Sequence, residues 1–171
     1  MSDLPASVRN EKFMRMIHHD AARSVKLTVC YNSEDRPPRL QMKGLPPGSV
    51  LPHVGTGTVI LDDPRFKHHP AYKAGQSFLI ETAAHVVYDN KEAEKTRVEF
   101  FLDDDIDRSN VVQCQGVCVV SMREDRDFCQ FVCEAKDPTI VDDSVRITLP
   151  TNSDSFKHSI ASKLVHDLWK D

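Results

Sequence analysis

The sequence contains no apolar stretch that approaches the roughly 20 residues needed for a membrane-spanning helix. Residues 1–5, Met-Ser-Asp-Leu-Pro, form a polar start without the apolar core of a signal peptide. We therefore expect a soluble protein that makes no contact with a membrane. Its expected location is the cytoplasm or another intracellular compartment.

The chain also lacks a strong excess of charge of either sign. Its 22 basic residues nearly balance its 26 acidic residues, which gives a net charge of −4. Nucleic-acid-binding proteins present a basic surface, so DNA and RNA are not expected partners. With 171 residues, 40% of them hydrophobic, the chain is long enough for one domain with its own core.

The cysteines do not form a disulfide framework in this sequence, because an odd number without a signal peptide favours reduced thiols. There are five, at Cys30, Cys114, Cys118, Cys129 and Cys133. In a strand, residues four apart lie about 13 Å apart on one face, so neither closely spaced pair can chelate zinc alone. Members of different pairs could meet across neighbouring strands. We expect the cysteines to serve as small apolar core residues.

No metal or cofactor site is expected from the other polar clusters. Adjacent histidines point apart, so His18-His19 and His68-His69 are interpreted as solvent-exposed residues. The acidic segment 103–107 resembles a calcium loop, but it lacks the glycine and the terminal glutamate of an EF-hand. It is expected to be a solvated hairpin tip.

Six segments have the composition and the alternating pattern of β-strands. They are separated by turn-rich connectors and not by helical patterns, which favours an antiparallel barrel over a parallel sheet. Closing the barrel would remove exposed edges. The expected strands are residues 24–31, 55–61, 76–81, 96–102, 111–122 and 127–134.

Helical patterns occur only near the two ends of the chain. Residues 1–23 form an N-terminal extension with a weak pattern typical of a short helix. Residues 24–150 contain the expected barrel domain. Residues 151–171 place Phe156, Ile160 and Leu164 at helical spacing, which predicts an amphipathic C-terminal helix.

Two motifs resemble the trypsin-like (chymotrypsin-fold, serine-type) peptidases. Gly55-Thr56-Gly57 is similar to the family's Gly-Ser/Thr-Gly strand, and Thr82-Ala83-Ala84-His85 is similar to the segment that ends in its catalytic histidine. The resemblance implies a Greek-key barrel with His85 as general base. Small residues before a histidine let its ring lie against the barrel wall, with one nitrogen toward a buried carboxylate and the other toward substrate. Val86 stands where secreted members commonly have a cysteine, so the chain is more similar to the disulfide-free branch.

The same resemblance identifies Asp127 as the carboxylate that would orient His85. In the family this aspartate directly precedes an apolar strand, and residues 126–132 are similar, with cysteine and glutamine at two positions that are usually apolar. The order histidine, strand, strand, aspartate also matches. Asp125 is the nearest rival and Asp107 a more distant one.

The family's nucleophile segment, Gly-x-Ser-Gly, is missing. Only six glycines occur, and none lies in such a segment. Gly116-Val117-Cys118 has the right offset, but its β-branched surroundings predict a strand and not the tight turn that builds an oxyanion hole. The chain after Asp127 is also too short for a second barrel of the family's kind.

Three functions are left open. The chain could be the N-terminal half of a trypsin-like peptidase, carrying the histidine and aspartate and inactive alone. It could be a pseudopeptidase barrel that binds proteins, or part of an enzyme whose serine comes from another chain. The expected partner is a protein or peptide, and a second copy or a partner chain would cover the exposed barrel face. A half-enzyme should expose a larger apolar surface than an adapted binding module.

Overall fold

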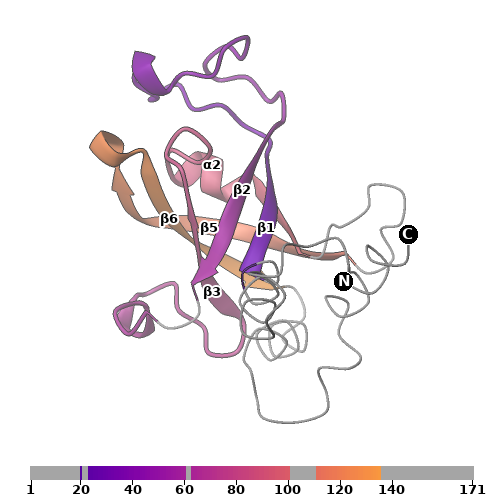
Figure 1. The fold of residues 1–171 in the computed structure, drawn as a ribbon, viewed down its shortest axis with the longest axis vertical. Helices are drawn as coiled ribbons and strands as arrows, with labels where there is room; N and C mark the ends of the chain where they lie inside the picture. Colours follow the sequence, from indigo (N-terminus) through magenta and orange to yellow (C-terminus); the bar gives the residue numbers. More distant parts are fainter. Residues whose placement is uncertain (1–19, 21–22, 61–62, 101–110, 136–171) are drawn as a thin grey trace, which may run out of the picture.

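A computed structural model describes residues 20, 23–60, 63–100 and 111–135 of the chain. These residues form a closed barrel of six antiparallel strands (Figure 1). Around the barrel the strand order is β1-β2-β3-β6-β5-β4. The expected antiparallel barrel is therefore confirmed, and each strand lies close to its expected range. The strands are β1 (Ser24–Val29), β2 (His53–Ile60), β3 (Ser77–Thr82), β4 (Thr96–Phe100), β5 (Val112–Arg123) and β6 (Phe128–Ala135).

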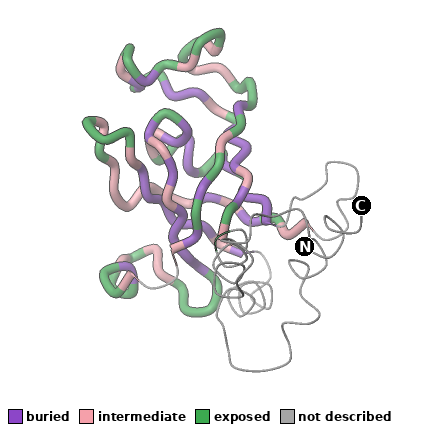
Figure 2. Tube along the Cα trace, viewed as in Figure 1, coloured by how far each residue is buried: buried purple, intermediate pink, exposed green. Residues whose placement is uncertain are grey.

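The barrel core is built from side chains that alternate along the strands. On β1, Val25, Leu27 and Val29 are buried, and Leu27 lies opposite Val98 of β4. Phe131 of β6 is fully buried within the same cluster. Figure 2 shows the buried segments running through the barrel, with exposed residues concentrated in the connecting loops.

The alternating pattern of the expected strands predicts that Phe100, Val120 and Phe131 are all largely buried, and two of the three are. Phe100 and Phe131 are buried, but Val120 is only half-buried. Val120 still packs against an apolar cluster. It is not fully buried because the pairing of β5 with β6 shifts twice, and one shift falls between Val119 and Ser121. Each bulge inserts an unpaired residue and changes which face the following side chains occupy.

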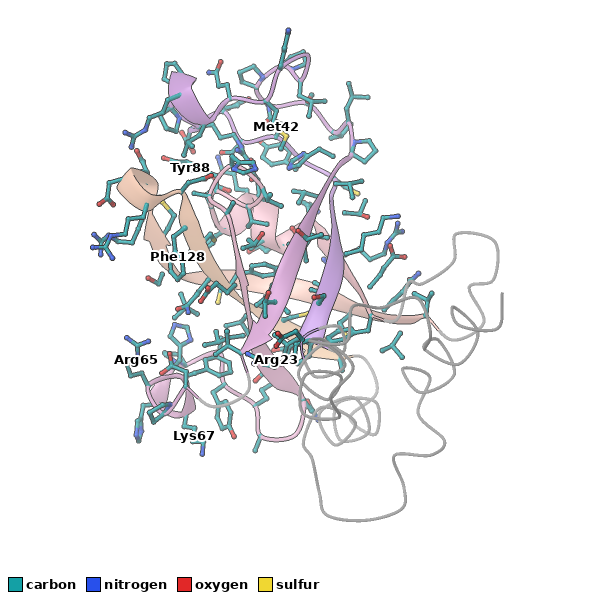
Figure 3. The ribbon with its side chains drawn as sticks, viewed as in Figure 1. Arg23, Met42, Arg65, Lys67, Tyr88 and Phe128 are labelled. Atoms are coloured by element: carbon teal, nitrogen blue, oxygen red, sulfur yellow. The ribbon has the colours of Figure 1, made fainter. Side chains whose placement is uncertain are left out.

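A second apolar cluster closes the outer face of β3 and β6. The loop of residues 63–76 contains the short 3-10 helix η3 (Phe66–His68), and Phe66 packs with Leu79 and Val132. Figure 3 shows Arg65 and Lys67 of this loop at one end of the molecule, with Tyr88 toward the other end. Within this loop His69 is half-buried and stacks on Phe66, so its expected full exposure is wrong.

A helix between strands was not expected, but a short one is present. Helix α2 (Asn90–Glu94) lies between β3 and β4, and its five residues are too few to produce a clear helical period in the sequence. Asp89 caps its start by accepting a hydrogen bond from the Glu92 N–H. The helix packs directly on β5 at Gly116, where an added Cβ would collide with the carbonyl oxygen of Ala93.

All five cysteines are free thiols. Cys114, Cys129 and Cys133 belong to the core cluster, as expected, whereas Cys118 is half-buried and Cys30 is exposed. The thiols of Cys114 and Cys133 meet across β5 and β6. Burial raises the pKa of Cys129 to about 12, which keeps it protonated at neutral pH.

Several expectations concern residues outside the described part of the chain. They include the helix predicted in the N-terminal extension, the acidic segment 103–107 and the C-terminal helix in 151–171. None of the helices in the described ranges has the length and apolar character needed to span a membrane.

Candidate functional site

His85 and Asp127 are joined by two hydrogen bonds. The ring atom Nδ1 of His85 lies 2.6 Å from Oδ2 of Asp127, and the backbone N–H of His85 donates to Oδ1 at 2.9 Å. His85 lies in the turn that follows β3, and Asp127 lies between the short 3-10 helix η4 (Glu124–Arg126) and β6. The pairing predicted from the sequence is confirmed. Its catalytic role stays a prediction.

The backbone of Asp127 turns its carboxylate toward His85. Among the described residues it is the only non-glycine residue with a positive φ, of 50°, in the left-handed region. Aspartate adopts this conformation more readily than most residues. The conformation ends η4 and starts β6 one residue later, so Asp127 is a turn residue and not the first residue of a strand as expected. Unusual backbone geometry of this kind is concentrated at functional sites.

The electrostatics of the pair fix the position of one proton. Partial burial alone would raise the pKa of Asp127, but the hydrogen bonds from the ring and backbone of His85 hold that pKa below its usual value. An ionised carboxylate only accepts hydrogen bonds, so Nδ1 of His85 carries the proton. In the neutral ring Nε2 then holds the lone pair, and it makes no hydrogen bond to any of the described residues.

The pair is more open to solvent than expected. The side chain of His85 is 52% exposed and that of Asp127 is 44% exposed, so the predicted buried carboxylate is wrong. The rival Asp125 bonds to Arg123 at 3.2 Å instead of to His85. The other rival, Asp107, lies outside the described residues.

The two sequence motifs are in direct contact. The Thr82 hydroxyl donates to the carbonyl oxygen of Thr56 at 2.7 Å. A Cβ added at Gly55 would lie 2.7 Å from Cγ2 of Val86 and closer still to Cγ1, and one at Gly57 would lie 2.6 Å from Cγ2 of Ile80. Glycine is therefore needed because β2 passes so close to the turn of His85 and to β3.

Arg36 supports the His85 turn from inside the protein. All five N–H donors of its guanidinium are used. Two go to the carboxylate of Glu92, each at 2.6 Å. The other three go to backbone carbonyl oxygens: those of Leu40 and His85 at 2.9 Å, and that of Val86 at 3.3 Å.

Glu92 completes this buried pair. Besides Arg36, its carboxylate accepts the backbone N–H of Ser33 at 2.7 Å and that of Tyr88 at 2.8 Å. Four acceptor positions are therefore filled, and both charged side chains are fully buried at 0% exposure. A buried ion pair tolerates this environment only when such hydrogen bonds are complete.

His53 joins the same network from the start of β2. Its Nε2 lies 2.9 Å from the carbonyl oxygen of Val86. A carbonyl oxygen can only accept, so Nε2 carries the proton, while the buried Nδ1 has no partner among the described residues. Burial lowers the pKa of His53, with a further contribution from the nearby Arg36 charge. The ring is held neutral.

Sequence reasoning missed Arg36, Glu92 and His53. Glu92 lies in the strongly charged segment 91–95, which has the composition of a solvated surface, and Arg36 precedes two prolines in a loop. The two residues are far apart in the sequence, and no local pattern connects them. One weak signal was the cap at Asp89 followed by Glu92, which is typical of a helix start.

No serine, threonine or cysteine among the described residues is hydrogen-bonded to Nε2 of His85. Gly116-Val117-Cys118 lies inside β5, so the prediction that this segment is a strand and not a turn is confirmed. No cluster of three or more metal-ligating side chains occurs in the described part either. What the site can do with these residues is hold an oriented imidazole base.

A scan against models of known families, a search of curated proteins and a search of solved structures each found no match for this chain.

Proposed function

We propose that this barrel is the half of a trypsin-like, serine-type endopeptidase that carries the histidine and aspartate of the triad. The observation that carries the proposal is the 2.6 Å contact between His85 Nδ1 and Asp127 Oδ2. It occurs where Thr-Ala-Ala-His leaves one strand of a closed antiparallel barrel. Two residues chosen for their motifs, one in the turn after β3 and one in the turn before β6, meet with the geometry that a general base needs.

Each residue has a defined chemical task in the proposed reaction. Nε2 of His85 would remove the proton from a serine hydroxyl as the oxygen attacks a peptide carbonyl, and would later return it to the leaving amine. Asp127 would keep the ring in the Nδ1–H tautomer and stabilise the imidazolium that forms. The nucleophile and the oxyanion hole would come from outside the described residues, on this or another polypeptide. The barrel by itself is therefore inactive.

A second function is favoured by the surface near β2. Val50, Leu51 and Val54 are large apolar side chains with 75%, 53% and 60% exposure. All three fall within residues 50–54, and grouped exposed apolar side chains are typical of protein-binding surfaces. On this alternative the barrel is a pseudopeptidase that binds a protein or peptide, and His85 has no catalytic task.

A serine-reactive fluorophosphonate probe tests the proposal. The purified chain should neither hydrolyse a generic protein substrate nor become labelled. When the chain is added to an extract of cells that lack it, a labelled serine protein should appear. His85→Ala and Asp127→Asn should abolish this labelling, and Asp125→Asn, which changes a neighbouring exposed carboxylate, should not.

The outcomes separate the two functions. Labelling of a serine within the purified chain would overturn the half-site proposal. Absence of any His85-dependent labelling in the extract would contradict the peptidase function. Binding of one defined protein, unchanged by His85→Ala but weakened by Leu51→Ser, would then support the pseudopeptidase.

A further inference from the structure

We propose that the buried pair of Arg36 and Glu92 is a positioning device for His85, an inference that rests on the proposed function of His85 as a base. Neither residue touches the reacting nitrogen. They act through the backbone of the histidine itself and of the residues that follow it, and without them the ring would not stay paired with Asp127.

His85 has little packing of its own. Its side chain is 52% exposed, and the only hydrogen bond made by its ring to the described residues is the one to Asp127. That carboxylate is itself 44% exposed. A half-exposed pair is weakened by competition with water, so the ring direction depends on how firmly the backbone of the turn is held.

Arg36 holds the backbone of this turn. Its Nη1 donates to the carbonyl oxygen of His85 itself, and its Nη2 donates to that of the next residue, Val86. The Val86 carbonyl also accepts the Nε2–H of His53. The Arg36 guanidinium lies 5.9 Å from the ring centroid of Tyr88, which restricts it further.

Glu92 holds the far end of the same segment, at Tyr88. Its carboxylate accepts the Tyr88 N–H, three residues after His85, and fixes the Arg36 guanidinium with two bonds. In the segment 85–88, the arginine therefore binds the carbonyl oxygens of the first two residues, and the glutamate binds the N–H of the last. Arginine suits this task because its rigid planar fork offers five donors, whereas lysine has one flexible ammonium.

The test reads the His85–Asp127 bond directly by NMR on the intact chain. A histidine Nδ1 proton that is hydrogen-bonded to a carboxylate gives a far-downfield ¹H signal. The rate at which this proton exchanges with solvent can be measured from that signal. The first variant, Arg36→Met with Glu92→Leu, replaces the pair by apolar side chains, a change that buried ion pairs often tolerate. The second variant, Arg36→Lys, keeps the positive charge but removes the planar guanidinium with its five donors.

The control is Lys73→Met with Glu134→Leu. It removes a surface ion pair of 2.8 Å at the other end of the β3–β6 pairing, because Glu134 lies opposite Ser77 whereas Cys129 lies opposite Thr82. We expect Nδ1–H exchange to become at least about fivefold faster in both Arg36 variants. The control should exchange like the unmodified chain.

Each outcome decides the matter. An Nδ1–H signal that keeps its exchange rate in a folded Arg36 variant would overturn the positioning role. Loss of the fold in both Arg36 variants would assign the pair to the core alone and would also overturn it. If the unmodified chain has no such signal, the hydrogen bond between His85 and Asp127 is contradicted. The proposed peptidase function, which depends on that bond, is then contradicted as well.

Discussion

At the scale of the residue, Asp127 orients His85 because its two carboxylate oxygens accept different N–H groups of the same residue. One accepts the backbone N–H and the other the ring Nδ1–H. The ring therefore has its Nδ1–H tautomer fixed and its direction fixed at the same time. A neutral amide in this position would keep the size of the side chain but would remove its negative charge and change what it can donate and accept.

Asp127→Asn should reverse the tautomer of His85. The asparagine N–H₂ group would donate to Nδ1, so the proton of the neutral ring would move to Nε2. The ¹⁵N chemical shifts of the ring nitrogens report this directly. In a completed enzyme the same change should lower kcat about 10⁴-fold.

Asp125→Asn is the matched control, since Asp125 is an exposed carboxylate on η4 that pairs with Arg123. It should leave the tautomer of His85 unchanged. An Nδ1–H tautomer that persists in Asp127→Asn would contradict the role assigned to this carboxylate.

At the scale of the element, the site depends on how closely β2 approaches the turn after β3. Gly55 leaves room for the side chain of Val86, and the Thr82 hydroxyl bonds to the Thr56 carbonyl oxygen. Val86 is part of the barrel core. The turn that contains His85 therefore packs on the core through the side chain of Val86.

Gly55→Ala should destabilise the protein by about 1–3 kcal/mol, the usual range for forcing an extra methyl group into a packed contact. The new Cβ would meet Cγ2 of Val86 at 2.7 Å. The free energy of unfolding, measured with urea, checks this value. Thr58→Ala, on an exposed position of the same strand, should change it by less than about 0.5 kcal/mol.

A double-mutant cycle that combines Gly55→Ala with Val86→Ala tests the cause. Val86→Ala removes the two methyl groups that the added Cβ would meet, so the double variant should be more stable than the sum of the single changes predicts. Strict additivity would mean that the two residues are not in contact.

At the scale of the whole molecule, the network behind His85 makes stability depend on pH. His53 is buried at 8% exposure, and its pKa is lowered from the ordinary value of 6.5, mainly by burial. The unfolded chain therefore binds a proton more readily than the folded one. The contribution of His53 is fully present above about pH 6.5 and is lost as the pH falls through its lowered folded value.

We expect the urea midpoint to fall between pH 7.5 and pH 5.5, and His53→Gln to reduce this decrease. Glutamine can still donate to the Val86 carbonyl but does not titrate. His68 is exposed and serves as the control. In His68→Gln the urea midpoint should keep its full pH dependence. A midpoint that rises on acidification, or a decrease unaffected by His53→Gln, would contradict the assignment.

Local patterns in the sequence were sufficient for the strands and for the candidate pair. Alternating apolar residues identify strands because side chains on a strand alternate between core and solvent. Thr-Ala-Ala-His and the acid before β6 were found because each motif is short and continuous in the chain. The antiparallel barrel followed from the absence of long helical segments between the strands.

Only the tertiary structure decided how the pair is supported and how open it is. Arg36 and Glu92 are 56 residues apart in the chain and meet at 2.6 Å in the interior, although charged side chains are normally expected at the surface. The bulges of β5 depend on pairing with β6, and the exposure of Asp127 depends on what covers it. A sequence pattern reports the periodicity of one segment. Burial of a charge and the register of two strands are set by contacts between segments that only the folded chain brings together.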